Sequence, residues 1–169
     1  MAFGLALPWS PGEERIHRLL HVPEQDNPTS SFLTPYGAHL LQQAPLLAVG
    51  TLDSEDRPWA TVWGGETGLS RPLGSSIIGL NTIVERKYDP VVQALFKGND
   101  DGEVMREEGM GRIVAGLTID LEKRKRVKLH GRMIAGAVTK SEEADGEDHG
   151  SGNLQLAVKI EQSLGELTI

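Results

Sequence analysis

The stretch LLAVGTLDSEDRPWATVWG, residues 46–64, decides how this chain folds. Residues 46–52 form a continuous apolar run, and residues 53–56 form a polar turn cluster. The next run, 58–63, is rich in β-branched and aromatic residues. Two such runs joined by a short polar turn predict a β-hairpin.

Outside this hairpin, further short strands are expected at 75–80, 113–121, 126–135 and 154–160. Short helices are expected at about 11–20, 34–44 and 90–97, where Ser10, Thr34 and Asp89 each precede a proline at the first helical position. Six short strands with few helices predict a small closed β-barrel, because closure removes exposed sheet edges.

The length of 169 residues fits a single domain over 1–169. Within it, 1–33 reads as an N-terminal helix and extended arm, and we expect 98–110 and 140–153 to be flexible, dispensable loops because they are polar and rich in Gly or acidic residues. The second of these loops is expected to be solvated.

Composition narrows the function. The net charge of −7 argues against nucleic acid as a main partner, since phosphate binding favours basic proteins. No apolar run approaches membrane-spanning length, so a soluble cytoplasmic protein is the expectation. The absence of Cys removes disulfides, thiolate metal sites and cysteine nucleophiles. No nucleophile elbow, Walker loop or dinucleotide-binding glycine pattern occurs either.

Two groups of basic residues are candidate anion sites. Lys128, His130 and Arg132 recur at period two with Arg126 beside them, so one strand face is basic in an acidic protein. Arg86 and Lys87 precede a capped helix, and two cations beside a helix N-terminus form a plausible phosphate site. Considered by charge alone, both groups are better explained as ordinary solvated surface.

Aromatic residues and histidines leave alternatives open. Trp59, Thr61 and Trp63 share one face of a strand, where the two indoles either line a flat ring site or fill the core. Gly64 and the glycine after it allow a ligand to approach the backbone. His17 and His21 have helical spacing but no third ligand nearby, which favours solvent exposure over a metal site.

The order of several segments resembles the pyridoxamine 5′-phosphate oxidase-like family of flavin-binding split barrels. The similar segments are WSPGE (9–13), residues 35–65, NTIVERK (81–87), LEKRKRVKLHG (121–131) and residues 154–165. The resemblance is greatest to a branch found as free-standing proteins and as the leading module of flavin/ferredoxin-type reductases. It implies a mainly β, six-stranded split barrel with a few flanking helices that dimerises and binds two flavins at the interface.

The resemblance also implies a set of binding residues for flavin mononucleotide (FMN). The phosphate would meet Arg86 and Lys87, and Arg126 would also reach the cofactor. Thr61, Val62, Trp63 and Gly64 would line the ring. The remaining expected contacts are Asn81, Thr82, Gln162 and Ser163.

The expected function is a flavin-dependent oxidoreductase, in which the cofactor carries the hydride and the protein binds and tunes it. Arg126 is the candidate cation beside the flavin N1 and O2, and His130 a candidate for proton transfer. Pyridoxamine phosphate oxidases hold their substrate with an Arg-x-His near the C-terminus, which this sequence lacks, so the family name does not give the substrate. The alternatives are a non-catalytic module for FMN, haem or a deazaflavin, and a partner domain of a reductase.

Overall fold

The structure, a computed structural model, describes residues 6–74, 76–141 and 150–165. Most of the loop expected at 140–153, the first residues of the arm and Ser75 therefore lie outside the described residues. The helices are α1 (Pro11–Leu19), α2 (Pro35–Gln43) and α3 (Pro90–Phe96). The strands are β1 (Thr29–Ser30), β2 (Leu46–Leu52), β3 (Pro58–Gly64), β4 (Ser70–Gly74), β5 (Ile77–Glu85), β6 (Met105–Arg106), β7 (Ile113–Asp120), β8 (Lys125–Lys140) and β9 (Ser151–Gly165).

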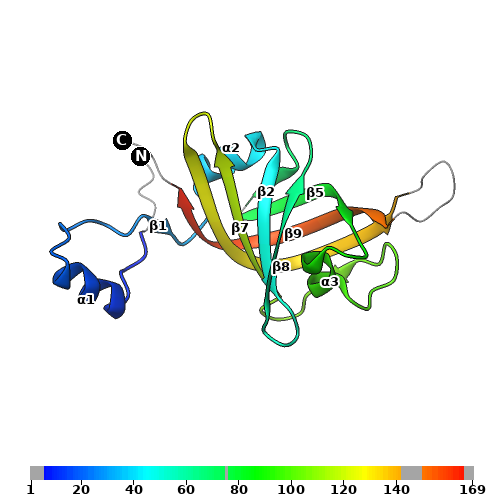
Figure 1. Ribbon diagram of the computed structural model, residues 1–169, viewed down its shortest axis with the longest axis horizontal. Coiled ribbons are helices and arrows are strands. Elements are labelled where there is room, and N and C mark those ends of the chain that lie inside the picture. The colour runs from blue at the N-terminus through cyan, green and yellow to red at the C-terminus, as the bar shows by residue number, and fades with distance from the viewer. Residues whose placement is uncertain (1–5, 75, 142–149, 166–169) are drawn as a thin grey trace.

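The strands form one antiparallel sheet in the order β3-β2-β7-β8-β9-β5-β4, which curls round into a barrel (Figure 1). Two-residue strands extend it, β1 on β9 and β6 on β8. The mainly β fold with short flanking helices is confirmed, and each of the six expected strands is present. The last runs much further than expected, from Ser151 to Gly165, because its polar outward residues alternate with buried ones throughout.

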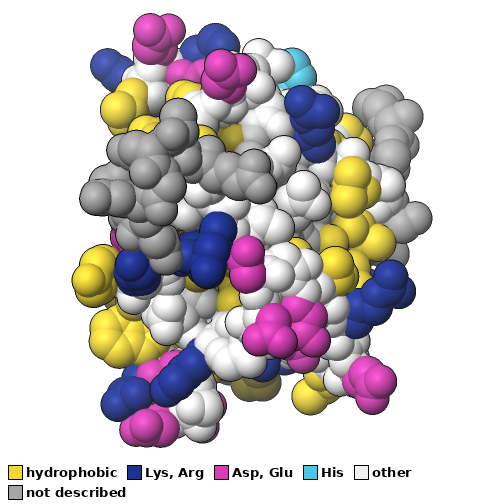
Figure 2. Space-filling view, turned by 90° about the vertical axis from the view of Figure 1, so that its right-hand side faces the viewer, with side chains coloured by type: hydrophobic (Ala, Val, Ile, Leu, Met, Phe, Trp, Pro, Cys, Tyr) yellow, Lys and Arg dark blue, Asp and Glu magenta, His cyan; other side chains and the backbone are white. Residues whose placement is uncertain are grey.

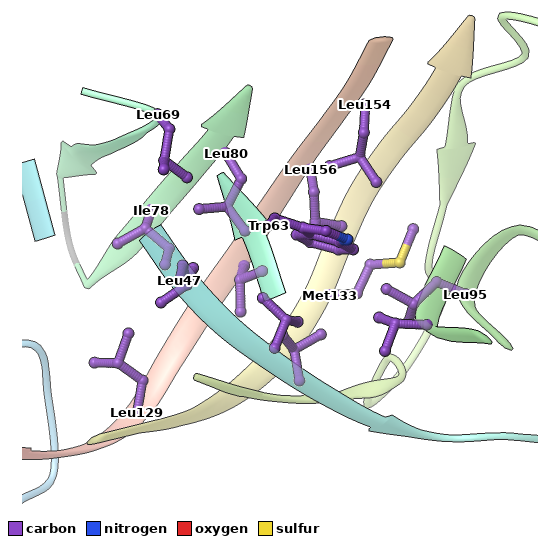
Figure 3. Close-up of a cluster of buried hydrophobic side chains, with 14 of the residues drawn as sticks. Leu47, Trp63, Leu69, Ile78, Leu80, Leu95, Leu129, Met133, Leu154 and Leu156 are labelled. Carbon is purple, nitrogen blue, oxygen red and sulfur yellow. The ribbon is translucent and has the colours of Figure 1, made fainter. Parts of the chain in front are cut away.

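The core lies inside the barrel and follows the inward residues of the long strands (Figure 3). Leu47 of β2, Trp63 of β3, and Leu129 and Met133 of β8 all lie in this cluster. The alternation of buried with less buried residues along β2 and β9 is the period-two pattern of a sheet with one face in the core. Of the two alternatives for the tryptophans, the core is therefore correct for Trp63, whereas Trp59 is 42% exposed and does not fill the core.

The helices begin as expected. Ser10 and Glu13 form a capping box at α1, and the Thr34 side chain accepts a hydrogen bond at the start of α2. Buried side chains of α2 and α3, Leu41 and Leu95 among them, join the core. The stretch 98–110 is held against β8, since Met105 packs on the core and the Gly102 amide donates to the Val138 carbonyl at 2.9 Å. Its dispensability stays a prediction.

Strand β4 lies at one end of the sheet order, and its pairing with β5 shifts register between Pro72 and Gly74. Pro72 has no amide hydrogen to donate, and Gly74 adopts a positive φ of 97°. Helix α2 packs against the same strand. The strand is therefore irregular along its length and partly covered by α2.

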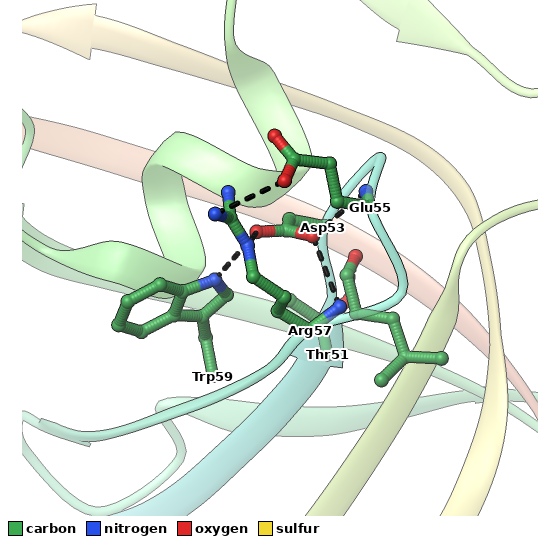
Figure 4. A network of polar contacts seen from close by, with 6 residues as sticks. Thr51, Asp53, Glu55, Arg57 and Trp59 are labelled. Atoms are coloured by element: carbon green, nitrogen blue, oxygen red, sulfur yellow. Dashed lines mark hydrogen bonds and ion pairs between the residues drawn. The ribbon is translucent and has the colours of Figure 1, made fainter.

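The β2–β3 turn is organised by Asp53 (Figure 4). Its carboxylate accepts from the Trp59 indole and from Arg57 Nε, both at 2.8 Å, and from the backbone amides of Glu55 and Arg57. The hydrogen bond from the Trp59 indole is the largest effect on the Asp53 carboxyl, and with the hydrogen bonds from Arg57 and Glu55 it outweighs desolvation and holds the pKa well below its usual range. The turn that the sequence predicted is thus held together by the ionised carboxylate of Asp53.

We expect Asp53→Asn to lower the melting temperature at neutral pH. A carboxyl with a lowered pKa stabilises the fold above its unfolded pKa of about 3.9, and this stabilisation is lost as the pH falls toward the folded value. The difference in melting temperature between the two proteins should therefore be constant above about pH 5 and shrink below about pH 4. Thermal scans across pH check this, with Glu108→Gln, an exposed carboxylate outside this network, as the control. A difference that does not depend on pH would contradict it.

Candidate cofactor site

The barrel is not closed by continuous strand pairing, because β3 and β5 lie next to each other without pairing. We call this gap in the pairing the β3–β5 split. The two strands are joined there by one hydrogen bond, from the Thr82 hydroxyl to the Gly64 carbonyl at 2.5 Å. The Asn81 amide donates to the Leu69 carbonyl at 2.8 Å, so the 65–69 connection closes the adjoining gap. Gly64, Asn81 and Thr82, expected from the sequence to share a site, therefore lie together at the split.

Thr61 and Trp63 face inward and are bound to the start of α3. The Thr61 hydroxyl and the Trp63 indole donate to Oδ2 of Asp89 at 2.9 and 3.0 Å. Its Oδ1 accepts from the Val91 and Val92 amides as the helix cap. One carboxylate therefore joins β3 to α3. The Trp63 indole is buried and therefore not available to a ligand, whereas the Val62 side chain is exposed.

The turn between β5 and α3 carries Arg86 and Lys87. The Arg86 amide donates to the Gly150 carbonyl at 2.7 Å, and its Nη1 lies 3.9 Å from a carboxylate oxygen of Asp101. The aliphatic part of Arg86 runs across Gly152, where a Cβ would come within 2.4 Å of Arg86 Cδ. This glycine therefore makes room for the arginine. Lys87 is exposed beside it.

A trough with a volume of about 510 Å³ lies on the outer face of β4, β5, β9 and β8. Its floor is flat because Gly79, Ala157 and Ala135 pair directly across three strands. The next row pairs Asn81, Gln155 and Ala137, which adds two amides to the surface. The walls come from the 66–69 connection, Arg71, Leu73 and Val104.

The other expected binding residues lie at the far end of the barrel. Arg126 is exposed on β8 opposite Ile119, and Gln162 is exposed opposite His130. Ser163 is buried, its hydroxyl donating to the Phe32 carbonyl at 2.6 Å and accepting from the Thr34 amide at 3.4 Å. Along β8, Arg126 is about 40 Å of strand from Thr139, whose carbonyl lies beside the Gly152–Arg86 contact. One chain does not bring Arg126 and Arg86 together.

Charge is mixed around these features. Figure 2 views the molecule from the α3 end, where basic and acidic side chains alternate and neither sign forms a continuous patch. On β8, His130 Nδ1 and Arg132 Nε lie 3.8 and 3.6 Å from the same Glu161 oxygen, so the basic row is partly balanced. Within the described ranges, no group of three or more His, Asp or Glu side chains is placed to hold a metal ion. No helix among the described residues has the length and hydrophobicity to span a membrane.

Sequence reasoning did not find the trough or the role of Asp89 as a link. Small residues at period two, such as Ala135 and Ala137, were a signal for the trough, but the pattern does not say which rows align across strands. Asp89 was recognised as a helix cap, and its second oxygen depends on a strand 26–28 residues away. Both features depend on contacts between residues that are far apart in the sequence.

Solved structures match this fold. A candidate pyridoxamine 5′-phosphate oxidase from Lactobacillus delbrueckii is 15% identical, with a TM-score of 0.48, over 80% of this chain and 95% of that chain. HupZ of Group A Streptococcus is 12% identical, with a TM-score of 0.47, over 81% of this chain and 96% of its own. The heme storage protein HutZ from Vibrio cholerae is 10% identical, with a TM-score of 0.45, over 79% and 95%. No protein-family model matches the sequence, and no curated protein matches it.

We expect Asp89→Ala to destabilise the protein by about 2–4 kcal/mol, because it removes a helix cap and leaves the buried Trp63 indole without its acceptor. Asp89→Asn keeps a capping oxygen and should cost less than half as much. Urea unfolding followed by tryptophan fluorescence measures both values. A loss below about 0.5 kcal/mol for Asp89→Ala would show that the link between β3 and α3 contributes nothing to stability.

Proposed function

We propose that this protein binds FMN along the outer edge of β5 and acts as a flavin-dependent oxidoreductase. The observation that carries the proposal is that three features follow one another along this strand. They are the Arg86–Lys87 turn, the β3–β5 split and the trough. From Asn81 to Arg86 the strand covers roughly 16 Å, a distance that a ribityl chain with a three-ring system can span.

The Arg86–Lys87 turn suits the phosphate. A phosphate monoester is close to a dianion at neutral pH, and charge-assisted hydrogen bonds to arginine and lysine are the strong ones. The aliphatic part of Arg86 is already positioned by the space over Gly152, so less conformational entropy is lost on binding. A bound phosphate would compete with Asp101 for the guanidinium. The donor set of the turn therefore fits the phosphate of FMN.

The trough suits the ring system. Its floor of Gly79, Ala157 and Ala135 offers a flat apolar surface, and the amides of Asn81 and Gln155 offer donors and acceptors for a polar ring edge. A pocket of this size with few polar groups is typical of cofactor sites. The 66–69 connection, which follows Gly64, would border the same ligand.

The distance between Arg86 and Arg126 favours a site built from two chains. If both arginines contact one flavin, Arg126 has to come from a second copy, and a twofold dimer would make two equal sites. Arg126 would then offset negative charge on the pyrimidine side of the ring. Gln162 lies at the same end of the chain and would come with it.

When bound, the flavin would supply hydride transfer, and this chain would bind it, orient it and exclude water. A non-catalytic role in holding FMN, haem or a deazaflavin is the second candidate. For FMN or a deazaflavin it is favoured by one observation, that among the described residues no histidine lines the trough to transfer a proton, whereas the same lining offers haem iron no histidine ligand. The visible spectrum of the purified protein and its reduction by NADH or NADPH in stopped flow, followed by oxygen, separate the two roles.

The phosphate assignment is tested by titrating FMN and riboflavin with flavin fluorescence. We expect Arg86→Ala and Lys87→Ala each to weaken FMN binding about ten- to a hundredfold, as expected for the loss of a charged hydrogen bond of roughly 1.5–3 kcal/mol. Riboflavin should bind the unmutated protein far more weakly than FMN, and the double variant about equally with FMN. Lys123→Ala, an exposed lysine in the turn between β7 and β8, is the matched control. Equal affinity of the unmutated protein for both flavins would refute the assignment.

A mixing experiment tests whether the site is built from two chains. Arg86→Ala and Arg126→Ala should each bind FMN weakly alone. After the two variants are mixed and allowed to exchange subunits, about a quarter of the sites should regain full affinity, because half of the dimers are mixed and each has one intact site. Sedimentation at micromolar concentration should show a dimer. A monomer, or no recovery on mixing, would contradict a two-chain site.

A further inference from the structure

Helix α1 has an exposed apolar stripe that the described part of the chain does not cover. Ile16, Leu19 and Leu20 have helical spacing and exposed fractions of 52%, 65% and 69%, and no residue of the helix is buried. α1 makes no extensive contact with another helix or strand of the described chain, and Figure 1 shows it standing clear of the barrel beyond β1.

The arm that carries α1, residues 6–28, is nonetheless well organised. The Leu7 amide donates to the Thr29 carbonyl at 2.9 Å, which closes the base of the arm. The Trp9 indole donates to the Gln25 carbonyl at 2.9 Å and packs edge-on against His17. A nine-residue helix is marginal in water by itself and usually depends on burying one face. Its order and its exposed stripe together indicate a surface that another molecule covers.

The root of the arm lies beside the Arg126 end of the barrel. Thr29 pairs with Leu164, and Leu164 pairs with Lys128, so the root is about 10 Å, or two strand spacings, from Lys128 and close to Arg126. If Arg126 meets Arg86 of a second copy, as the proposed function requires, the arm is carried toward that copy's Arg86 end. In such a dimer the arm would lie between the barrel of its own chain and the second copy.

The Arg86 end has a matching set of uncovered apolar side chains. Val62, Ile83 and Tyr88 are 62%, 68% and 82% exposed, and they flank the split and the Arg86–Lys87 turn. A twofold dimer would contain this contact twice, once for each arm, and a stable interface needs about 1,200 Å² in total. Exposed apolar residues on both partners are what such an interface buries.

We propose that α1 docks through Ile16, Leu19 and Leu20 on a second copy of this chain, against Val62 and Ile83 beside the β3–β5 split. Each arm then covers the cofactor site of the other chain. This inference rests on the proposed two-chain site and adds the arm to it as a wall that the partner supplies.

Cross-linking tests the contact directly, because the natural sequence has no cysteine. One protein carries Leu19→Cys and a second carries Val62→Cys, and the two are mixed and treated with a short bismaleimide. We expect a cross-linked species containing one copy of each. The control pair replaces Leu19→Cys with Arg18→Cys on the opposite face of α1, and should cross-link far less. Equal cross-linking by the two pairs overturns the inference. Carried on one chain at high dilution, both cysteines should give no intramolecular product, and such a product also overturns it.

A second measurement uses the triple variant Ile16→Ser, Leu19→Ser, Leu20→Ser. Because α1 buries nothing on its own chain, the melting temperature of the monomer should not change, whereas the dissociation constant of the dimer should rise at least about tenfold. Glu14→Gln with Arg18→Gln, on the opposite helix face, should leave it within about twofold. If sedimentation and the mixing experiment show the two-chain site while the triple variant dimerises normally, the arm contact is wrong and the proposed function stands. If the unmutated protein is a monomer, both the arm contact and the proposed two-chain site are wrong.

Discussion

The split between β3 and β5 is the constraint on which the rest of this molecule depends. Because β3 and β5 do not pair as strands, backbone groups along both of them must be satisfied in other ways. Here Thr82 supplies one hydroxyl to Gly64, the 65–69 connection supplies another acceptor to β5, and Asp89 draws β3 onto α3. Each of these is a part-buried polar contact beside the split, and the exposed Asn81 and Val62 lie next to them.

The features that surround the split have different physical origins. The trough depends on strand register, since it exists only because Gly79, Ala157 and Ala135 fall in one row. The cationic turn depends on packing, since Arg86 can lie flat only over a glycine. The inward tryptophan depends on its acceptor, because a buried indole hydrogen without a partner would cost free energy. The site therefore combines a flat apolar surface, the trough, with a positioned positive charge, Arg86. No catalytic residue is needed to explain either feature.

The strands and helices could be predicted from local signals. Local sequence predicts the strand at 46–52, the turn at 53–56 and the helices that begin at a cap followed by proline. The number of predicted strands then indicates a barrel. The candidate site could be predicted only in part. Gly64, Asn81, Thr82 and Arg86 do gather at one end, but the expectation placed Arg126 beside them, and a strand's length along the barrel is not visible in a motif. Ser163 illustrates the same limit, because its hydroxyl is bound to Phe32 and Thr34, more than a hundred residues away in sequence.

The irregular strand β4 has a consequence for how copies of this protein can meet in a crowded solution. A regular outer strand offers a template on which the strand of a neighbour can add, and repetition of that step produces fibrils. Pro72 interrupts the row of donors, the register shift at Gly74 twists it, and α2 packs against it. Growth by strand addition is thereby discouraged at the β4 end of the sheet.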